Sequence, residues 1–402
     1  MKKLILLMVW GLSVSAYAVN ARAVNGIADK DPLGDPTRTR SISKTFAASQ
    51  TDKINLSNQF GSMVIKVWDR KEVKIDITIS AYGNNEKQAQ ESIDQVDIQA
   101  EKTGDIISCK TEIDRENKWS RRNNKAELKV SYIVYVPVSN ALTLSQQFGS
   151  IHMPDYSGAL SVKVQYGNFV AGKLTDNNNY ISVQYGKATI AELNKATIKQ
   201  QYGAGLEIGT VGELNLTAQY AAVNITAIRG NATIKQQYGS GLKIGSVNNL
   251  DLSAQYVNVN IGTIKGDATI KQQYNNIEIS TAGQLTLKAQ YAGVTVGSLR
   301  GNADINMTYN NFSLSELGAG CKNLVINAAY SNINMGFASN YNGEFNLQKS
   351  YGGFRYGNNV KVVQAGDDDE SRSSSKNYAG RIGHGAGGNI RIKASYGSVT
   401  FK

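Results

Sequence analysis

The side chains that most often perform catalysis or bind metals are few in this chain and lie far apart. Its 402 residues include two histidines, His152 and His384, and two cysteines, Cys109 and Cys321. No Cys-x-x-Cys pair, closely spaced histidines, phosphate-binding glycine loop with lysine or nucleophile elbow occurs. We therefore predict no catalytic residues, no cofactor or cofactor-binding residues, and no metal ligands.

One run of carboxylates, Asp367-Asp368-Asp369-Glu370, has the oxygen ligands that a hard cation such as Ca²⁺ requires. It lacks the spaced oxygen ligands of a calcium-binding loop, so a solvated loop is the favoured interpretation.

The repeat described below predicts a parallel β-helix, and parallel β-helices include polysaccharide lyases and hydrolases. An enzyme is therefore the main alternative to a structural or binding protein. Such enzymes need paired carboxylates, or a basic residue with Ca²⁺ ligands, on one exposed face. The acidic residues in the central part of the chain, such as Glu207 and Asp251, are isolated from one another. The sequence therefore favours a protein that is not an enzyme.

A repeat of Gln-Tyr pairs dominates the chain. The tyrosines Tyr202, Tyr220, Tyr238, Tyr256 and Tyr274 are 18 residues apart. A short fixed period of alternating apolar residues indicates stacked coils, because one such unit cannot bury its own apolar face.

Each repeat contains two short strands. In the coil after Tyr202, Leu206 and Ile208 alternate with polar residues, and Leu214 and Leu216 do the same after a glycine-containing turn. Successive coils run in the same sense and therefore form parallel sheets. The predicted fold is all-β, a single parallel β-helix, or β-solenoid, with ~18-residue coils.

The Gln-Tyr pair is predicted to form the corner of each coil. Strand parity places the tyrosine ring on the inner side, whereas Gln201, Gln219, Gln237 and Gln255 should form an outward ladder of amides. The opposite orientation would expose the tyrosines as a stripe and make the column an aromatic binding platform.

Basic residues recur at every second coil. Lys199, Lys235 and Lys271 are 36 residues apart, as are Arg229 and Lys265. Like charges would then be separated by about two strand spacings, roughly 10 Å. The favoured reason is avoidance of directly stacked charges, and the alternative is a linear basic track for a polyanion.

The N-terminus has the pattern of a secretory signal peptide. Lys2 and Lys3 precede an apolar run too short to span a bilayer, and small residues permit cleavage after Ala18 or Ala23. The formal net charge of +11 falls to +8 when Lys2, Lys3 and Arg22 are removed (11 − 3). We expect an exported protein with no transmembrane segment after cleavage and no nucleic-acid partner.

The predicted organisation has four parts. They are a signal peptide at 1–23, a flexible leader at 24–43, an irregular N-terminal β region that caps the solenoid at 44–140, and the regular solenoid at 141–402 with a loop insertion at about 365–388. Within the cap, strands are expected at 53–56, 63–68 and 73–79, and a short helix at 85–95 with Ala89 and Ile93 on one face. The final strands, near 389–394 and 398–402, should close the stack.

The basic loop at 115–125 contains Trp119, which offers a glycan- or anion-contacting tip, although a solvated loop is favoured.

The two cysteines are expected to lie far apart. If the coils stack at about 4.8 Å each, Cys109 and Cys321 are roughly 50 Å apart, beyond the reach of a disulfide. Both cysteines should therefore be unpaired and buried.

The chain resembles bacterial adhesin-like β-strand-repeat proteins of the cell envelope. The resemblance covers the chain from about Lys44 onward and rests on its Asn58-Gln59-Phe60-Gly61 start, the turn at 67–73, the Tyr135-Val136-Pro137 junction and the Tyr-Gly rungs. It implies a right-handed parallel β-helix in an exported envelope protein, and it supplies no functional residues.

These observations together predict an exported structural or binding module of the bacterial cell envelope. Its repeated polar faces would contact a cell-surface glycan or an envelope protein. The expected location is the periplasm, the outer-membrane surface or the extracellular space, and the oligomeric state is left open. A β-helical polysaccharide lyase or hydrolase is the alternative.

Overall fold

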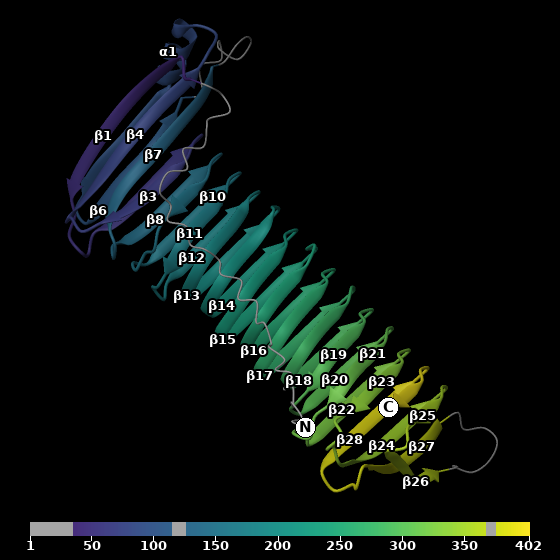
Figure 1. The fold of residues 1–402 in the computed structure, drawn as a ribbon. Coiled ribbons are helices and arrows are strands. Elements are labelled where there is room, and N and C mark those ends of the chain that lie inside the picture. The colour runs from purple at the N-terminus through teal and green to yellow at the C-terminus, as the bar shows by residue number, and fades with distance from the viewer. Residues whose placement is uncertain (1–34, 115–125, 367–374) are drawn as a thin grey trace, which may run out of the picture. The chain divides into compact units, whose positions relative to one another are not determined.

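The structure is a computed structural model that describes residues 35–114, 126–366 and 375–402. Residues from Pro36 to Lys402 form one compact unit. Its coils, about 11 in number and of roughly 18 residues each, stack into a β-solenoid, as the sequence predicted (Figure 1). The expected signal peptide at 1–23, the basic loop at 115–125 and the acidic run at 367–370 lie outside the described residues.

The described elements follow one another in three groups. The N-terminal group is β1 (Arg38–Ala47), β2 (Lys53–Gln59), β3 (Met63–Trp68), β4 (Glu72–Tyr82), α1 (Glu86–Asp94), β5 (Val96–Thr103), β6 (Ile106–Ile113) and β7 (Glu127–Pro137). The central group is β8 (Ala141–Gln147), β9 (Ile151–Met153), β10 (Leu160–Gln165), β11 (Phe169–Leu174), β12 (Asn179–Gln184), β13 (Lys187–Gln201), β14 (Gly205–Gln219), β15 (Val223–Gln237), β16 (Leu242–Gln255), β17 (Val259–Gln273) and β18 (Ile277–Gln290). The C-terminal group is β19 (Val294–Leu299), β20 (Ala303–Thr308), β21 (Phe312–Leu317), β22 (Asn323–Ala329), β23 (Ile333–Phe337), β24 (Gly343–Ser350), β25 (Phe354–Tyr356), β26 (Val360–Gly366), β27 (Ser375–Ile382), β28 (Gly388–Ser395) and β29 (Val399–Phe401).

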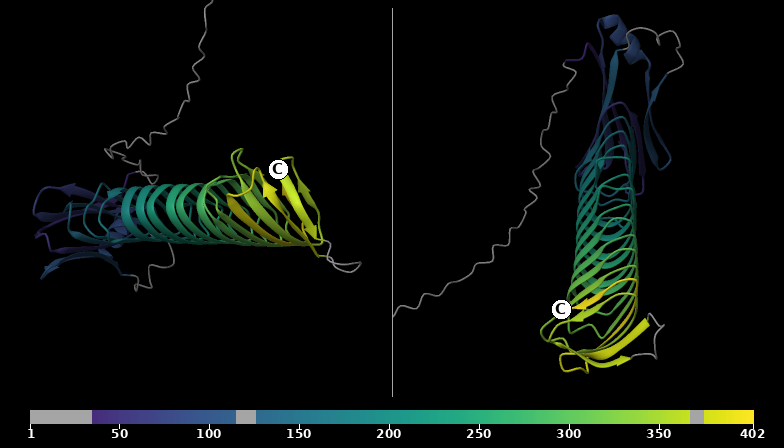
Figure 2. Two further views of the ribbon diagram at one scale, coloured as in Figure 1. Left: turned by 90° about the horizontal axis from the view of Figure 1, so that it is seen from below. Right: turned by 90° about the vertical axis from the view of Figure 1, so that its right-hand side faces the viewer.

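Each coil contributes one segment to each of two parallel sheets. Figure 2 shows the coils as flattened loops stacked on one another, with one sheet on each flat side. Sheet I contains the segments that follow an aromatic corner, such as β3, β9, β11 and β21. Sheet II contains the segments that lead into the next corner, such as β2, β8, β10 and β12. The long strands β13 to β18 run through both sheets, and several have register shifts at the bend between the two halves.

The core lies between the two sheets. Along β14 the buried residues alternate with exposed or half-buried ones on both sides of the bend, so Leu206, Ile208, Leu214 and Leu216 all point inward. This alternation is the pattern that period-2 strands with one buried face require. Parallel pairing then places like residues over like, as with Leu216 between Ile198 and Ile234.

Buried glutamines alternate with alanines from one coil to the next, and this alternation explains why the sequence repeat has a period of two coils. Gln200, Gln236 and Gln272 are fully buried, and each donates its side-chain Nε2–H to a backbone carbonyl at the preceding corner. In the coils between them, the same position is Ala218, Ala254 and Ala289. Where the inner residue is alanine, the residue after the corner tyrosine is Ala221, Val257 or Ala292, each fully buried. Long and short side chains therefore fill the corner in turn.

The N-terminal end is closed by antiparallel strands rather than by a further coil. Sheet I continues from β3 through β7 and β4 to β1, and sheet II continues from β2 through β6 to β5. The strands expected at 53–56, 63–68 and 73–79 are confirmed in β2, β3 and β4. The expected helix is confirmed as α1, with Ala89 and Ile93 buried.

The leader predicted at 24–43 is wrong from Arg38 onward, because β1 pairs with β4 along its whole length. Ile42 and Phe46 pack against the core, while most other side chains of β1 are exposed. An edge strand has a partner on one side only, so its polar composition resembles that of a linker.

The C-terminal end differs from a simple continuation of the stack. Strand β28 is inserted between β22 and β24, and β29 lies between β23 and β25 (Figure 1). The expectation that the last strands close the stack is therefore wrong. The insertion predicted at 365–388 is also only in part a loop, since it contains β27, which pairs antiparallel with β24 and β26.

The two cysteines, Cys109 and Cys321, are both free and buried, which confirms the prediction made from their positions. Burial raises the pKa of the Cys109 thiol and raises the pKa of Cys321 to about 11. Thiols in such surroundings are poor nucleophiles, so these cysteines belong to the core.

Candidate functional site: the outer face of sheet II

An unbroken column of aromatic rings runs along the edge of sheet II. Its fourteen rings make thirteen consecutive stacked contacts, with centroids 4.3 to 5.5 Å apart and interplanar angles of 2° to 16°. In stacking order they are Phe60, Phe148, Tyr166, Tyr185, Tyr202, Tyr220, Tyr238, Tyr256, Tyr274, Tyr291, Tyr309, Tyr330, Tyr396 and Tyr351. We call this set the aromatic column.

The aromatic column faces solvent, so the prediction of inward tyrosines is wrong. Twelve of its residues are between 38% and 55% exposed. All fourteen have a positive φ, between 50° and 59°. Alternation of sides holds only while the backbone is extended, and a left-handed residue turns the chain and directs its own side chain away from the core. The alternative of an exposed stripe is the one that the structure has.

Stacking decides which part of each ring a ligand can reach. Because the rings lie nearly parallel and about one strand spacing apart, their faces are turned toward their neighbours. Their edges and hydroxyl groups point to solvent. A ligand lying along the column would therefore meet a row of hydroxyls and ring edges rather than open ring faces.

A ladder of glutamines lies beside the aromatic column and confirms the sequence prediction. Gln219 donates its Nε2–H to Oε1 of Gln237 at 3.2 Å, and Gln237 donates in the same way to Gln255 at 3.1 Å. Further bonds of the same direction, 2.8 to 3.4 Å long, join Gln165 to Gln184, Gln184 to Gln201, Gln201 to Gln219 and Gln273 to Gln290. Each amide keeps a second N–H for solvent or a ligand.

A lysine row runs parallel to the glutamine ladder, two residues before it on each strand. The register aligns Lys199 with Thr217, Thr217 with Lys235, and Lys235 with Ser253. The row comprises Lys163, Lys199, Lys235, Lys271, Lys288 and Lys393, all exposed. None of these six takes part in a salt bridge among the described residues, whereas Arg229 pairs with Glu192 at 2.6 Å.

Shallow hollows lie on this face between the lysine row and the aromatic column. One, of about 290 Å³, is lined by residues such as Lys163 and Gln165 near the N-terminal end. Another, of about 440 Å³, is lined by Lys271, Lys288 and Gln290, among others. The face therefore forms an interrupted groove with basic and amide walls.

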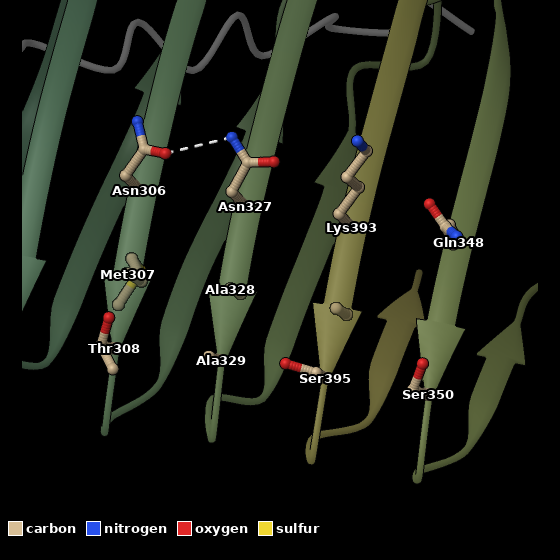
Figure 3. Close-up of a pocket in the computed structure, with 11 residues that line it drawn as sticks. Asn306, Met307, Thr308, Asn327, Ala328, Ala329, Gln348, Ser350, Lys393 and Ser395 are labelled. Carbon is tan, nitrogen blue, oxygen red and sulfur yellow. Dashed lines mark hydrogen bonds between the residues drawn. The ribbon is translucent and has the colours of Figure 1, made fainter. Parts of the chain in front are cut away.

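We call the C-terminal end of the groove the trough. Here the glutamines of the ladder are replaced by Thr308, Ala329, Ser395 and Ser350, which are aligned across β20, β22, β28 and β24. Figure 3 shows these small residues in one row at the strand ends and Asn306, Asn327, Lys393 and Gln348 in the other. The hollow between them measures about 400 Å³.

Catalytic machinery is not evident on this face. No group of three or more His, Cys, Asp or Glu residues suited to a metal ion occurs in the part of the chain that the structure describes. Glu207 is paired with Lys187 at 2.8 Å and lies on sheet I. Asp251 lies on sheet II next to Thr269, in the row beyond the lysines. The arrangement supports repeated hydrogen bonding and charge attraction.

Replacing Tyr238 by Ala should destabilise the solenoid. The variant loses two ring contacts, with Tyr220 at 5.2 Å and Tyr256 at 5.1 Å. At about 0.5–1.5 kcal/mol for each aromatic pair, the cost is about 1–3 kcal/mol. Thermal unfolding should show a lower Tm for Tyr238→Ala and a Tm close to that of the parent for Tyr238→Phe, which keeps both contacts. Equal Tm values for Ala and Phe would contradict a stabilising role of stacking.

No helix among the described residues is long and apolar enough to cross a membrane. No family model matches the chain, and no curated protein matches it.

Solved bacterial structures match with low similarity. A "putative cell adhesion protein" from Clostridium sporogenes is 11% identical, with 91% of this chain and 99% of that chain covered and a TM-score of 0.17. A "putative adhesin" from Bacteroides fragilis is 14% identical, with 75% and 100% covered and a TM-score of 0.20. A "putative lipid binding protein" from Parabacteroides distasonis is 11% identical, with 92% and 98% covered and a TM-score of 0.17. The adhesin names agree with the family that the sequence resembles, but likenesses at these TM-scores carry no argument about function.

Proposed function

We propose that this chain is an exported binding module of the bacterial cell envelope and that it binds a linear glycan along the outer face of sheet II. The observation that carries the proposal is the aromatic column, exposed and unbroken, beside a hydrogen-bonded ladder of glutamines. The signal-peptide pattern at 1–23 and the resemblance to envelope proteins support the exported location.

The chemistry of the face suits a polymer rich in hydroxyl groups. The glutamine amides offer one free N–H and a carbonyl oxygen in each coil, and the tyrosines add one hydroxyl in each coil. These groups recur at the strand spacing of about 4.8 Å, so an extended polymer meets the same donors and acceptors many times. Contacts that are weak one by one then add up through multivalency.

The rigidity of the side chains on this face also favours glycan binding. The side chains of the ladder are held by one another, as in the 3.0 Å bond from Gln201 to Gln219, and the rings are held by stacking. A surface that is already ordered loses little conformational entropy when a ligand binds. An extended glycan chain matches such a surface better than a flexible protein loop, which would have to be ordered at the same time.

The test is binding of the mature chain to a panel of soluble linear polysaccharides, measured by affinity electrophoresis and calorimetry. The double variant Gln219→Ala, Gln237→Ala should weaken binding by about tenfold, equivalent to ~1.4 kcal/mol. The matched control is Asn224→Ala, Asn260→Ala on sheet I, which should bind as the parent does. The proposal fails if no polysaccharide binds, or if the sheet I variant loses as much affinity as the sheet II variant.

A further inference from the structure

We propose that the trough at the C-terminal end of sheet II binds a carboxylate-bearing sugar unit of an acidic glycan, with Lys393 as the counter-ion. This inference rests on the proposed glycan-binding function and specifies the chemical class of the ligand. It follows from three properties of the trough: the small residues at the position of the ladder, its charge and its polar lining.

The trough has room for a sugar ring and, unlike the hollows at Lys163 and Lys271, is not lined by glutamines of the ladder. Along the middle of the face, the space between the lysine row and the aromatic column holds the glutamine side chains. At β22, β28 and β24 that position is Ala329, Ser395 and Ser350, which leaves the hollow of about 400 Å³ (Figure 3). The tyrosines beside it are also the most exposed of the column, with Tyr330 at 50%, Tyr396 at 51% and Tyr351 at 55%.

The charge of the trough is positive. Lys393 is exposed, stands in the middle of one wall between Asn327 and Gln348, and no carboxylate lines the hollow. Arg391 lies two residues away on the same strand and donates to Oδ1 of Asn323 at 3.2 Å. Asp304 lies two residues before Asn306 on β20, and its Oδ1 accepts a hydrogen bond from Asn306 at 2.8 Å. A carboxylate placed at Lys393 would gain a charge-assisted hydrogen bond.

The other polar side chains that line the trough can form hydrogen bonds with the hydroxyl groups of a sugar. Asn327 donates its Nδ2–H to Oδ1 of Asn306 at 3.0 Å, and this bond holds both amides in a fixed row. Gln348 on the far side of Lys393 supplies another amide, and Ser395 and Ser350 supply hydroxyls. A few placed polar groups beside an apolar edge are typical of small-ligand sites, and here the tyrosine edges supply the apolar part.

The lysine row extends the same preference along the face. Lys288 is aligned with Asn306, which is one wall residue of the trough, and Lys271 lies next to Lys288. A polyanion anchored at Lys393 would therefore pass further unpaired ammonium groups on its way along sheet II. Attraction to such a row raises the rate of association and decreases as salt is added.

The experiment compares a short oligogalacturonate with its fully methyl-esterified form, because esterification removes the negative charge of each carboxyl group and adds only one methyl group to it. Binding to the mature chain is measured by calorimetry at low and at high salt. The acid should bind at least about tenfold more tightly than the ester at low salt, and the difference should shrink at high salt. Lys393→Gln should lower the affinity for the acid by about tenfold and so remove most of this preference.

Lys243→Gln is the matched control, because Lys243 is exposed, loses the same charge and lies on sheet I. It should keep the preference for the acid. Since both side chains are exposed, the Tm should be unchanged in both variants. The inference is wrong if the ester binds as tightly as the acid, or if the two variants behave alike; glycan binding itself then stands. If neither oligomer nor any polysaccharide of the panel binds, the proposed function fails instead.

Discussion

Removal of residues 388–402 should unfold the C-terminal end of the solenoid and leave the central coils intact. The deletion takes away β28 and β29, and with them the parallel partners on which β24 and β25 stack. It also removes Phe401, whose ring packs edge-on against Phe337, Phe345 and Phe354 at 5.2 to 5.4 Å. Loss of one buried phenylalanine side chain costs about 3–5 kcal/mol, so loss of two strands exceeds the stability of this end.

Limited proteolysis followed by mass spectrometry measures this effect. New cleavage sites should appear between Gly343 and Ile382, in β24 to β27, whereas β13 to β18 should stay resistant because each repeat depends mainly on its neighbours. A full-length control with Arg391→Gln and Lys393→Gln changes only exposed side chains of β28 and should stay resistant in β24 to β27. Continued protection of the segment from Gly343 to Ile382 in the shortened chain would contradict the role of β28.

A side chain at Gly186 should be among the most damaging single changes at an aromatic corner. A Cβ atom built on Gly186 lies 1.7 Å from the carbonyl oxygen of Gly167 in the preceding coil. Gln200 also donates its amide to the carbonyl of Gly186, so the corner has little freedom to move. Gly186→Val should therefore lower the free energy of unfolding by about 3 kcal/mol or more, as steric overlap with a fixed backbone does.

The matched control for this variant is Gly241→Val, in another corner of the same solenoid. There the nearest atom to a Cβ is the carbonyl oxygen of Asn258, at 3.9 Å. Thermal unfolding of the two variants should give a much lower Tm for Gly186→Val, with Gly241→Val within a few degrees of the parent. Similar Tm values would show that the corner at Gly186 can shift as a unit.

The sequence was sufficient for the repeated part of the fold because the repeat encodes it locally. The spacing of the tyrosines gave the coil length, the alternation around Leu206 and Leu214 gave two strands, and the position of Gln219 gave the amide ladder. Each of these features depends on residues within one coil or on the identical position of the next coil.

The sequence-based predictions fail at the tyrosines, where the backbone is not extended, and at β28, which pairs with a strand distant in the chain. Strand parity predicts an inward ring at Tyr220, but its φ of 51° ends the extended backbone at that residue. The insertion of β28 depends on a pairing between Ile326 and Ile392, which are separated by β23 to β27 in the chain. Nothing in the local pattern of 389–394 distinguishes a final strand from an inserted one.

The candidate binding face was only partly predictable. The lysines at 36-residue intervals and the outward glutamines were visible in the sequence, and so was the option of an exposed tyrosine stripe. The trough was not, because it requires Ser395 of β28 to stand between Ala329 and Ser350. Its small residues come from segments that are distant in the sequence, and only the order of strands in sheet II brings them together.

The glutamine ladder gives the binding face a direction. Every bond in it, from Gln165 to Gln184 and on to Gln273 and Gln290, has the N–H pointing toward the same end of the stack. Aligned amide dipoles add, as they do along an α-helix, and leave partial positive charge where the last N–H has no glutamine to bond. The bonds form two runs, from Gln165 to Gln255 and from Gln273 to Gln290, and the second run ends at Gln290, beside Thr308 and the trough. A glycan also has two different ends, so one orientation of the polymer on sheet II should be preferred over its reverse.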